Sequence, residues 1–299
     1  MKPAATAGQT WLWAMNDESQ DVEPDRAARF LERVAKEALP RIIGATVPFY
    51  AIQNDQVKRD RSGVLLRIGD EYFILTASHN LKAIVESQIH LYVGWDEDEK
   101  IPVRIPDAIF HTTEEDSRDV AAIKLSKEAA KRILTTKRAI SMRDIRVEPE
   151  RSPGMFFICG FPQAWTSVSS EEIVSKPLPF ITRFFRGETS PNASIKYDPV
   201  IHALFDFNRN AIGADKLENV VLPSFQGIRG ISGCGVWRVV DWDADSVDSW
   251  NADDCKLVAI QHRYFEREKY VHTTWIKFAL SRIADDYPEM QAAMNIVYP

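Results

Sequence analysis

The sequence predicts an all-β fold of short antiparallel strands, arranged as a barrel or a sandwich. Short apolar segments such as 46–52, 63–68 and 72–76 follow one another along the chain, and no long helical segment separates them. The turn residues Gly69 and Asp70 lie between two of these segments, which is the pattern of a β-hairpin. A parallel α/β sheet would require a helix between successive strands, so the pattern favours an antiparallel architecture.

Similar segments continue towards the C-terminal part of the chain. The remaining strands are expected at 89–93, 101–105, 120–125, 155–159, 180–185, 200–207, 235–240 and 257–261. Ser126 is expected to cap a helix over 127–134, and residues 135–151 are expected to connect a first β-rich lobe to a second. A closing helix with one apolar face is expected after Thr274, its predicted cap.

Residues 1–40 are expected to form an N-terminal extension that contains one amphipathic helix. Pro24 suits the first turn of a helix, and apolar residues from Ala27 to Ala38 recur at intervals of three and four. Pro40 is expected to end this helix. Its charged face is interpreted as a solvated surface rather than a binding site.

Composition excludes several classes of protein. The chain has 299 residues with 37 basic and 43 acidic side chains, and its net charge of -6 argues against nucleic acid as the main partner. No run of about 18 apolar residues is present to span a membrane. No secretory signal is recognised, and the three cysteines (Cys159, Cys234 and Cys255) show no metal-binding spacing. We therefore expect a cytoplasmic protein without disulfides, metal or cofactor.

Three short segments carry the residues of a possible reaction centre. An apolar strand over 73–79 ends on His79, Asp119 begins the apolar segment 119–125, and Ser232 lies in a glycine-rich turn. A serine hydroxyl attacks a carbonyl only when a neighbouring imidazole accepts its proton. A carboxylate orients that imidazole, and backbone amides stabilise the oxyanion. Together the three segments predict acyl transfer.

These segments resemble the motifs of the chymotrypsin/trypsin family, particularly its bacterial intracellular members. The matching segments are Thr76–His79, Asp119–Leu125 and Gly230–Gly233. The resemblance covers roughly residues 41–285. It implies a chymotrypsin-like fold of two antiparallel six-stranded β-barrels, with an N-terminal helical extension and a C-terminal helix.

The resemblance also implies domain limits and residue roles. The peptidase domain would span 41–285, with barrels at about 41–130 and 150–272, followed by a tail at 286–299. Ser232 would be the nucleophile, His79 the base and then the acid, and Asp119 the orienting acid. The amides of Gly230 and Ser232 would form the oxyanion hole. Asp116 is a competing acid nearby, but no apolar strand follows it.

The sequence departs from the family pattern at two positions beside the serine. Ile231 replaces the aspartate that pairs with a new N-terminus in zymogen-type members, so that activation switch cannot operate. The site is then either preformed or ordered by something else. Cys234 replaces a frequent glycine and is interpreted as a small buried residue.

The family pattern places the substrate pocket at Gln226, His262 and Arg263. Gln226 gives no reason for cleavage after lysine or arginine, and a wall of His262 and Arg263 would favour an acidic or polar side chain before the scissile bond. The alternative interpretation has both of these side chains facing solvent.

The expected function is that of a serine endopeptidase acting on a protein or peptide through an acyl-enzyme. An unrestrained cytoplasmic peptidase would be harmful, so we expect narrow specificity or gating by a regulatory protein partner. The N-terminal helix or the acidic surface loop over 241–254 would mediate such gating. The alternative is a catalytically idle scaffold that binds protein partners.

Overall fold

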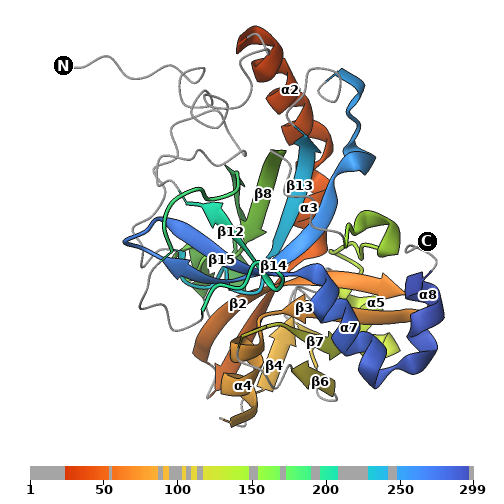
Figure 1. The fold of residues 1–299 in the computed structure, drawn as a ribbon. Coiled ribbons are helices and arrows are strands. Elements are labelled where there is room, and N and C mark those ends of the chain that lie inside the picture. Colours follow the sequence, from red (N-terminus) through yellow and green to blue (C-terminus); the bar gives the residue numbers. More distant parts are fainter. Residues whose placement is uncertain are drawn as a thin grey trace.

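The computed structural model describes residues 24–53, 56–86, 90–93, 103–105, 109–112, 117–147, 154–168, 173–189, 196–207, 228–241 and 248–295. Two large antiparallel sheets form the body of the protein, and helices lie at both ends of the chain (Figure 1). The predicted all-β double barrel with terminal helices is confirmed.

The first sheet contains seven strands among the described residues, where the family resemblance implied six. All of its pairs are antiparallel, in the order β5-β4-β1-β2-β3-β7-β6. The strands are β1 (Thr46–Gln53), β2 (Gln56–Ile68), β3 (Glu71–Thr76), β4 (His90–Val93), β5 (Val103–Arg104), β6 (Ile109–Thr112) and β7 (Ala121–Lys124).

The second sheet has six strands in the order β11-β8-β13-β14-β15-β12, again all antiparallel. A separate hairpin pairs β9 with β10. The strands are β8 (Gly154–Gly160), β9 (Thr166–Val168), β10 (Ile173–Ser175), β11 (Leu178–Thr182), β12 (His202–Asp206), β13 (Gly235–Asp241), β14 (Lys256–Phe265) and β15 (Tyr270–Trp275).

Helices occupy the ends of the chain and the connections. The α-helices are α2 (Pro24–Glu37), α3 (Leu39–Ala45), α4 (Ser78–Glu86), α5 (Lys127–Ile133), α7 (Ile276–Asp286) and α8 (Gln291–Asn295). Short 3-10 turns are η1 (Met142–Asp144), η2 (Gln163–Trp165), η4 (Ala252–Asp254) and η5 (Pro288–Met290). Within the described part of the chain, every helix is too short or too polar to cross a bilayer.

Two predicted helix boundaries are wrong. After a break at Ala38 the chain continues as helix α3. Pro40 lies in the first turn of α3, where the missing backbone N–H costs no intrahelical hydrogen bond. Residues 41–45 are therefore helical rather than extended. Thr274 belongs to β15 and does not cap α7, whose N-cap is Trp275. By contrast Ser126 does cap α5, accepting a hydrogen bond from the amide of Ala129 at 3.2 Å.

The central strands are buried on both faces. Along β2, Val64 and Leu66 join a core shared by the two sheets, whereas Leu65 points into the interior of the first sheet. The second sheet alternates in the same way. Phe157 of β8 joins the shared core and Phe156 points inward. Side chains on opposite sides of a strand alternate, so these near-continuous apolar runs fill two cores at once.

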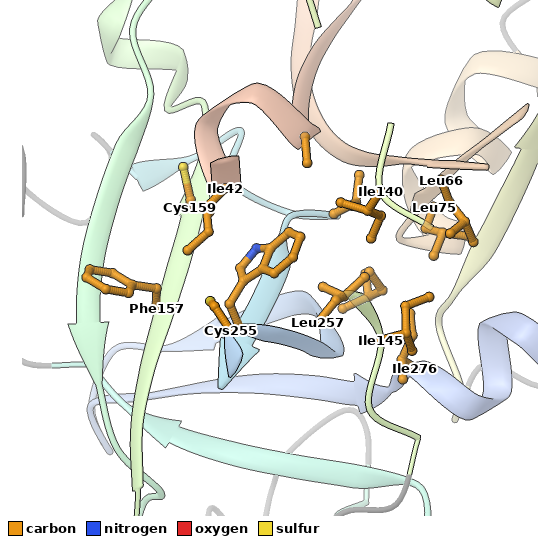
Figure 2. Close-up of a cluster of buried hydrophobic side chains, with 14 of the residues drawn as sticks. Ile42, Leu66, Leu75, Ile140, Ile145, Phe157, Cys159, Cys255, Leu257 and Ile276 are labelled. Atoms are coloured by element: carbon orange, nitrogen blue, oxygen red, sulfur yellow. The ribbon is translucent and has the colours of Figure 1, made fainter. Parts of the chain in front are cut away.

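The shared core also receives the connecting segment and the helices (Figure 2). Leu66 and Leu75 of the first sheet lie on one side of the cluster in the figure, and Phe157 of the second sheet lies on the other. Ile140 and Ile145 of the connection belong to the same cluster, on the side of Leu66 and Leu75 in the figure. The two sheets are thus held by one hydrophobic cluster rather than by a flexible linker.

The N-terminal helix α2 packs into this core through its apolar face. Phe30 is 4% exposed and contacts the Trp250 ring edge-to-face, with ring centroids 5.5 Å apart. Trp250 is itself buried, and its indole N–H donates to the carbonyl of Val239 at 2.8 Å. The prediction that 241–254 is wholly a surface loop is therefore wrong at Trp250, while residues 242–247 lie outside the described residues.

We predict that Phe30→Ala lowers the free energy of unfolding by about 3 to 5 kcal/mol, because it leaves a cavity beside Trp250. Urea denaturation measures the change. The matched control is Arg26→Ala on the same helix, whose ion pair with the exposed Asp248 is worth less than about 1 kcal/mol. An equal, small effect of both substitutions would show that α2 is not part of the folded core.

Candidate active site

The three sequence segments that predict acyl transfer converge at the junction of the two sheets. His79 lies in the first turn of α4, directly after β3, and Asp119 precedes β7 of the same sheet. Ser232 lies in the turn before β13 of the second sheet. Helix α4 was not predicted, although Leu81, Ile84 and Val85 recur at the helical interval.

The side chains of Ser232, His79 and Asp119 form one hydrogen-bonded row. The Oγ of Ser232 lies 3.0 Å from Nε2 of His79. The Nδ1 of His79 lies 2.8 Å from Oδ2 and 3.1 Å from Oδ1 of Asp119. Because an ionised carboxylate only accepts, the Nδ1 carries the proton, and Nε2 presents its lone pair to the serine.

Asp119 is buried and its backbone is strained. Its residue is 4% exposed, and its φ of 36° falls in the left-handed region that L-residues rarely occupy. Two backbone amides of α4 hold it. The amide of His79 donates to Oδ1 at 2.9 Å, and the amide of Ser78 donates to the Asp119 carbonyl at 3.3 Å. A buried carboxylate requires such donors to offset the loss of water.

Two glycines shape the turn that carries Ser232. Gly230 and Gly233 have φ values of 102° and 93°, which non-glycine residues adopt only with strain. A Cβ on Gly233 would also collide with the carbonyl of Ser62 and the hydroxyl of Thr76. No acceptor for the amides of Gly230 and Ser232 is found within the described ranges.

The first sheet fastens this turn of the second sheet. The Ser62 hydroxyl donates to the Gly230 carbonyl at 2.9 Å and accepts from the Phe161 amide at 2.8 Å. The Ser62 amide donates to the Ser232 carbonyl at 3.1 Å, and the Asn80 side chain donates to the same carbonyl at 3.0 Å. The turn conformation is thus fixed from across the junction.

The arrangement of two antiparallel sheets with these three side chains at their junction identifies the architecture. The fold is chymotrypsin-like. No family model and no curated protein sequence matches the chain.

Several solved structures are similar to the chain at low sequence identity. The serine endoprotease from Yersinia pestis is 14% identical with a TM-score of 0.48, over 87% of this chain and 66% of that one, so this chain spans just under two thirds of its length. An active-form protease from M. tuberculosis is 11% identical with a TM-score of 0.46, over 85% and 84% of the two chains. A Glu endopeptidase is 12% identical with a TM-score of 0.45, over 81% and 90%. These likenesses assign no activity, substrate or residue role.

The structure describes two of the three expected pocket residues, His262 and Arg263. Gln226, like the competing acid Asp116, lies outside the described residues. The His262 side chain is completely buried, so the interpretation in which it faces solvent is wrong. Its Nδ1 lies 3.5 Å from Oδ2 of Asp119, and its carbonyl oxygen lies 3.1 Å from Oγ of Ser232. Arg263 is partly exposed on β14.

A cluster of three buried histidines behind Asp119 was not anticipated from the sequence. His202 of β12, His262 of β14 and His272 of β15 place one nitrogen each within 4.8 Å of one another. Burial lowers the pKa of all three, that of His262 well below its ordinary value and that of His272 to about 3. Nothing in the sequence marks this cluster, because its members lie on three separate strands.

All three cysteines are buried free thiols. Burial raises the pKa of Cys159 and of Cys255 to about 12, and that of Cys234 well above its ordinary value. A nucleophilic or redox-active cysteine requires a lowered thiol pKa. Cys234 is therefore a packing residue beside Ser232, as its sequence position suggested.

We predict that acid destabilises the protein partly through His272. Its pKa is about 3 in the folded state and about 6.5 when unfolded, so between these values only the unfolded chain binds the proton. The free energy of unfolding falls by up to about 1.4 kcal/mol per pH unit as the pH drops from 6.5 towards 3. Urea denaturation of wild type and His272→Gln at pH 6.0 and 4.5 measures this. An identical pH dependence in the two proteins would contradict the prediction.

Proposed function

We propose that the protein is a serine endopeptidase that cleaves a protein or peptide through an acyl-enzyme. The observation that supports this best is the row of hydrogen bonds from the Ser232 hydroxyl through His79 to Asp119. The amides of Gly230 and Ser232 supply the second requirement, which is stabilisation of an oxyanion. A scaffold without activity would have no need of either feature in this geometry.

In the proposed mechanism, Oγ of Ser232 attacks the peptide carbonyl while its proton passes to Nε2 of His79. Asp119 keeps the other ring proton on Nδ1 and stabilises the imidazolium that forms. The amides of Gly230 and Ser232 donate to the oxyanion. His79 then returns its proton to the leaving amine, and a water molecule hydrolyses the acyl-enzyme by the same steps in reverse.

The restraint on such an enzyme is proposed to be substrate specificity rather than movement of α2. Helix α2 is packed against Trp250, and Figure 1 draws it at the opposite end of the protein from α4, the helix that carries His79. The turn around Ser232 is fixed by Ser62 and Asn80 without a cleaved N-terminus. We therefore propose a preformed site in a cytoplasmic enzyme of narrow specificity.

We predict that a fluorophosphonate probe labels wild-type protein on Ser232, and that Ser232→Ala abolishes the labelling. Ser232→Ala and His79→Ala lower peptide turnover on the order of 10⁶-fold, because the nucleophile and its base act as a unit. Mass spectrometry of the labelled peptide locates the adduct, and circular dichroism checks that both variants fold. Equal labelling of wild type and Ser232→Ala would reject the proposed function.

We also propose that Arg263 contributes to the choice of substrate. It directly follows His262 on β14 and is partly exposed. A guanidinium favours a carboxylate or another hydrogen-bond acceptor on the substrate.

Cleavage of a peptide library is expected to show a preference for an acidic or polar residue before the scissile bond. Arg263→Gln is expected to weaken that preference through KM, since it removes charge but keeps hydrogen-bonding groups. A strict preference for lysine or arginine would overturn the role of Arg263 without affecting that of Ser232.

A further inference from the structure

The loop that presents Asp119 belongs to the first sheet, yet it also contacts the second sheet. The carbonyl of Ser117 lies against Nε2 of His202, and the carbonyl of Arg118 accepts a hydrogen bond from the Thr274 hydroxyl. The carboxylate of Asp119 faces Nδ1 of His262. Three consecutive residues of this loop are thus contacted from β12, β14 and β15.

The hydrogen-bond partners of His202 fix which of its nitrogens carries the proton. Its Nδ1 faces the amide of Asp198 at 3.0 Å, and an amide can only donate. Its Nε2 faces the carbonyl of Ser117, and a carbonyl can only accept. His202 is therefore neutral and donates from Nε2 to the loop that carries Asp119.

The charge that His262 faces indicates which of its ring nitrogens carries the proton. Its Nδ1 lies 3.5 Å from the Asp119 carboxylate, and its Nε2 lies 3.1 Å from Nδ1 of His272 and 3.2 Å from the Thr274 hydroxyl. A bare Nδ1 would turn a lone pair towards a buried carboxylate, which is repulsive. With the proton on Nδ1, the N–H dipole stabilises the carboxylate, and Nε2 accepts from the Nδ1–H of His272.

A metal ion does not fit this cluster as well as hydrogen bonds do. Zinc requires a lone pair from each imidazole, and both nitrogens of His202 are already occupied by backbone groups. Binding a metal would therefore break the contact between His202 and the Asp119 loop. The lowered pKa of each imidazole agrees with three neutral rings in a buried cluster.

We propose that His202, His262, His272 and Thr274 form a neutral histidine bracket by which the second sheet positions Asp119. His202 and Thr274 hold the two preceding carbonyls, and these contacts offset the strain of the left-handed backbone at Asp119. Nδ1 of His262 faces Oδ2 of the carboxylate at 3.5 Å, and His272 holds the ring of His262 in the required tautomer. In this arrangement His262 is a positioning residue, because it acts on His79 only through Asp119.

The tautomers provide a test that does not depend on activity. The chain contains six histidines, so nitrogen-15 labelling of histidine gives a simple NMR spectrum in which substitution of each residue assigns its signals. At pH 7 we expect His202 protonated on Nε2 and His262 protonated on Nδ1. A His262 ring protonated on Nε2, or stoichiometric binding of added Zn²⁺ that His202→Ala abolishes, would overturn the proposal.

The role in positioning rests on the proposed function and is tested by kinetics. His262→Leu is expected to lower kcat on a peptide substrate roughly 10- to 100-fold with KM nearly unchanged, since a misplaced carboxylate misorients His79. His262→Asn, whose amide can donate from a similar position, is expected to recover most of that loss. The control is Ile260→Val on the same strand, which faces the shared core and is expected to leave kcat within about twofold.

The two proposals fail in different ways. Equal losses in His262→Leu and His262→Asn, with folding intact by circular dichroism, would overturn the bracket while labelling of Ser232 continued to support a peptidase. The expected tautomers without any labelling of Ser232 would reject the peptidase and leave the bracket as a contact between the sheets.

Discussion

The central strands of both sheets are buried on their two faces, and the rest of the structure depends on this. Leu66 and Leu75 on one side and Phe157 on the other belong to a single core, which also takes in the connecting segment and α2. A core that is close-packed in this way resists sliding of one sheet on the other. The hydrogen bond between Ser232 and His79, which lie on different sides of the junction, therefore joins two sheets that a single core holds in place.

This arrangement buries the charged carboxylate of Asp119 at the junction of the two sheets. Asp119 is buried with a left-handed backbone, and both features are unfavourable alone. The structure offsets them with donors from two directions. Amides of α4 hold the carboxylate and its carbonyl from the first sheet, while His202 and Thr274 hold the preceding carbonyls from the second. Of these donors, His202 and Thr274 are themselves buried residues.

The parts of this architecture that are local in sequence could be predicted. Apolar alternation located most strands, and the three segments around His79, Asp119 and Ser232 were recognisable when taken together. Features that depend on distant contacts were not. Strand β15 was not predicted, because His272 and its threonine neighbours make its sequence polar. Their hydrogen-bond partners lie in β12, β14 and the Asp119 loop. Trp250 looked like part of a surface loop, because its partner Phe30 lies more than two hundred residues earlier.

The turn around Ser232 also shows how an ionic contact can be replaced by packing. Zymogen-type relatives of the resembled family order this turn through an aspartate before the serine, and Ile231 stands there in this chain. Ile231 is 2% exposed and belongs to the interior core of the second sheet. It sits so close to Gly160 that a side chain at Gly160 would collide with it. In this chain the turn is held by apolar burial on one side and by the hydrogen bonds of Ser62 on the other, in place of that ion pair. Neither contact requires cleavage of the chain, which agrees with the preformed site proposed above.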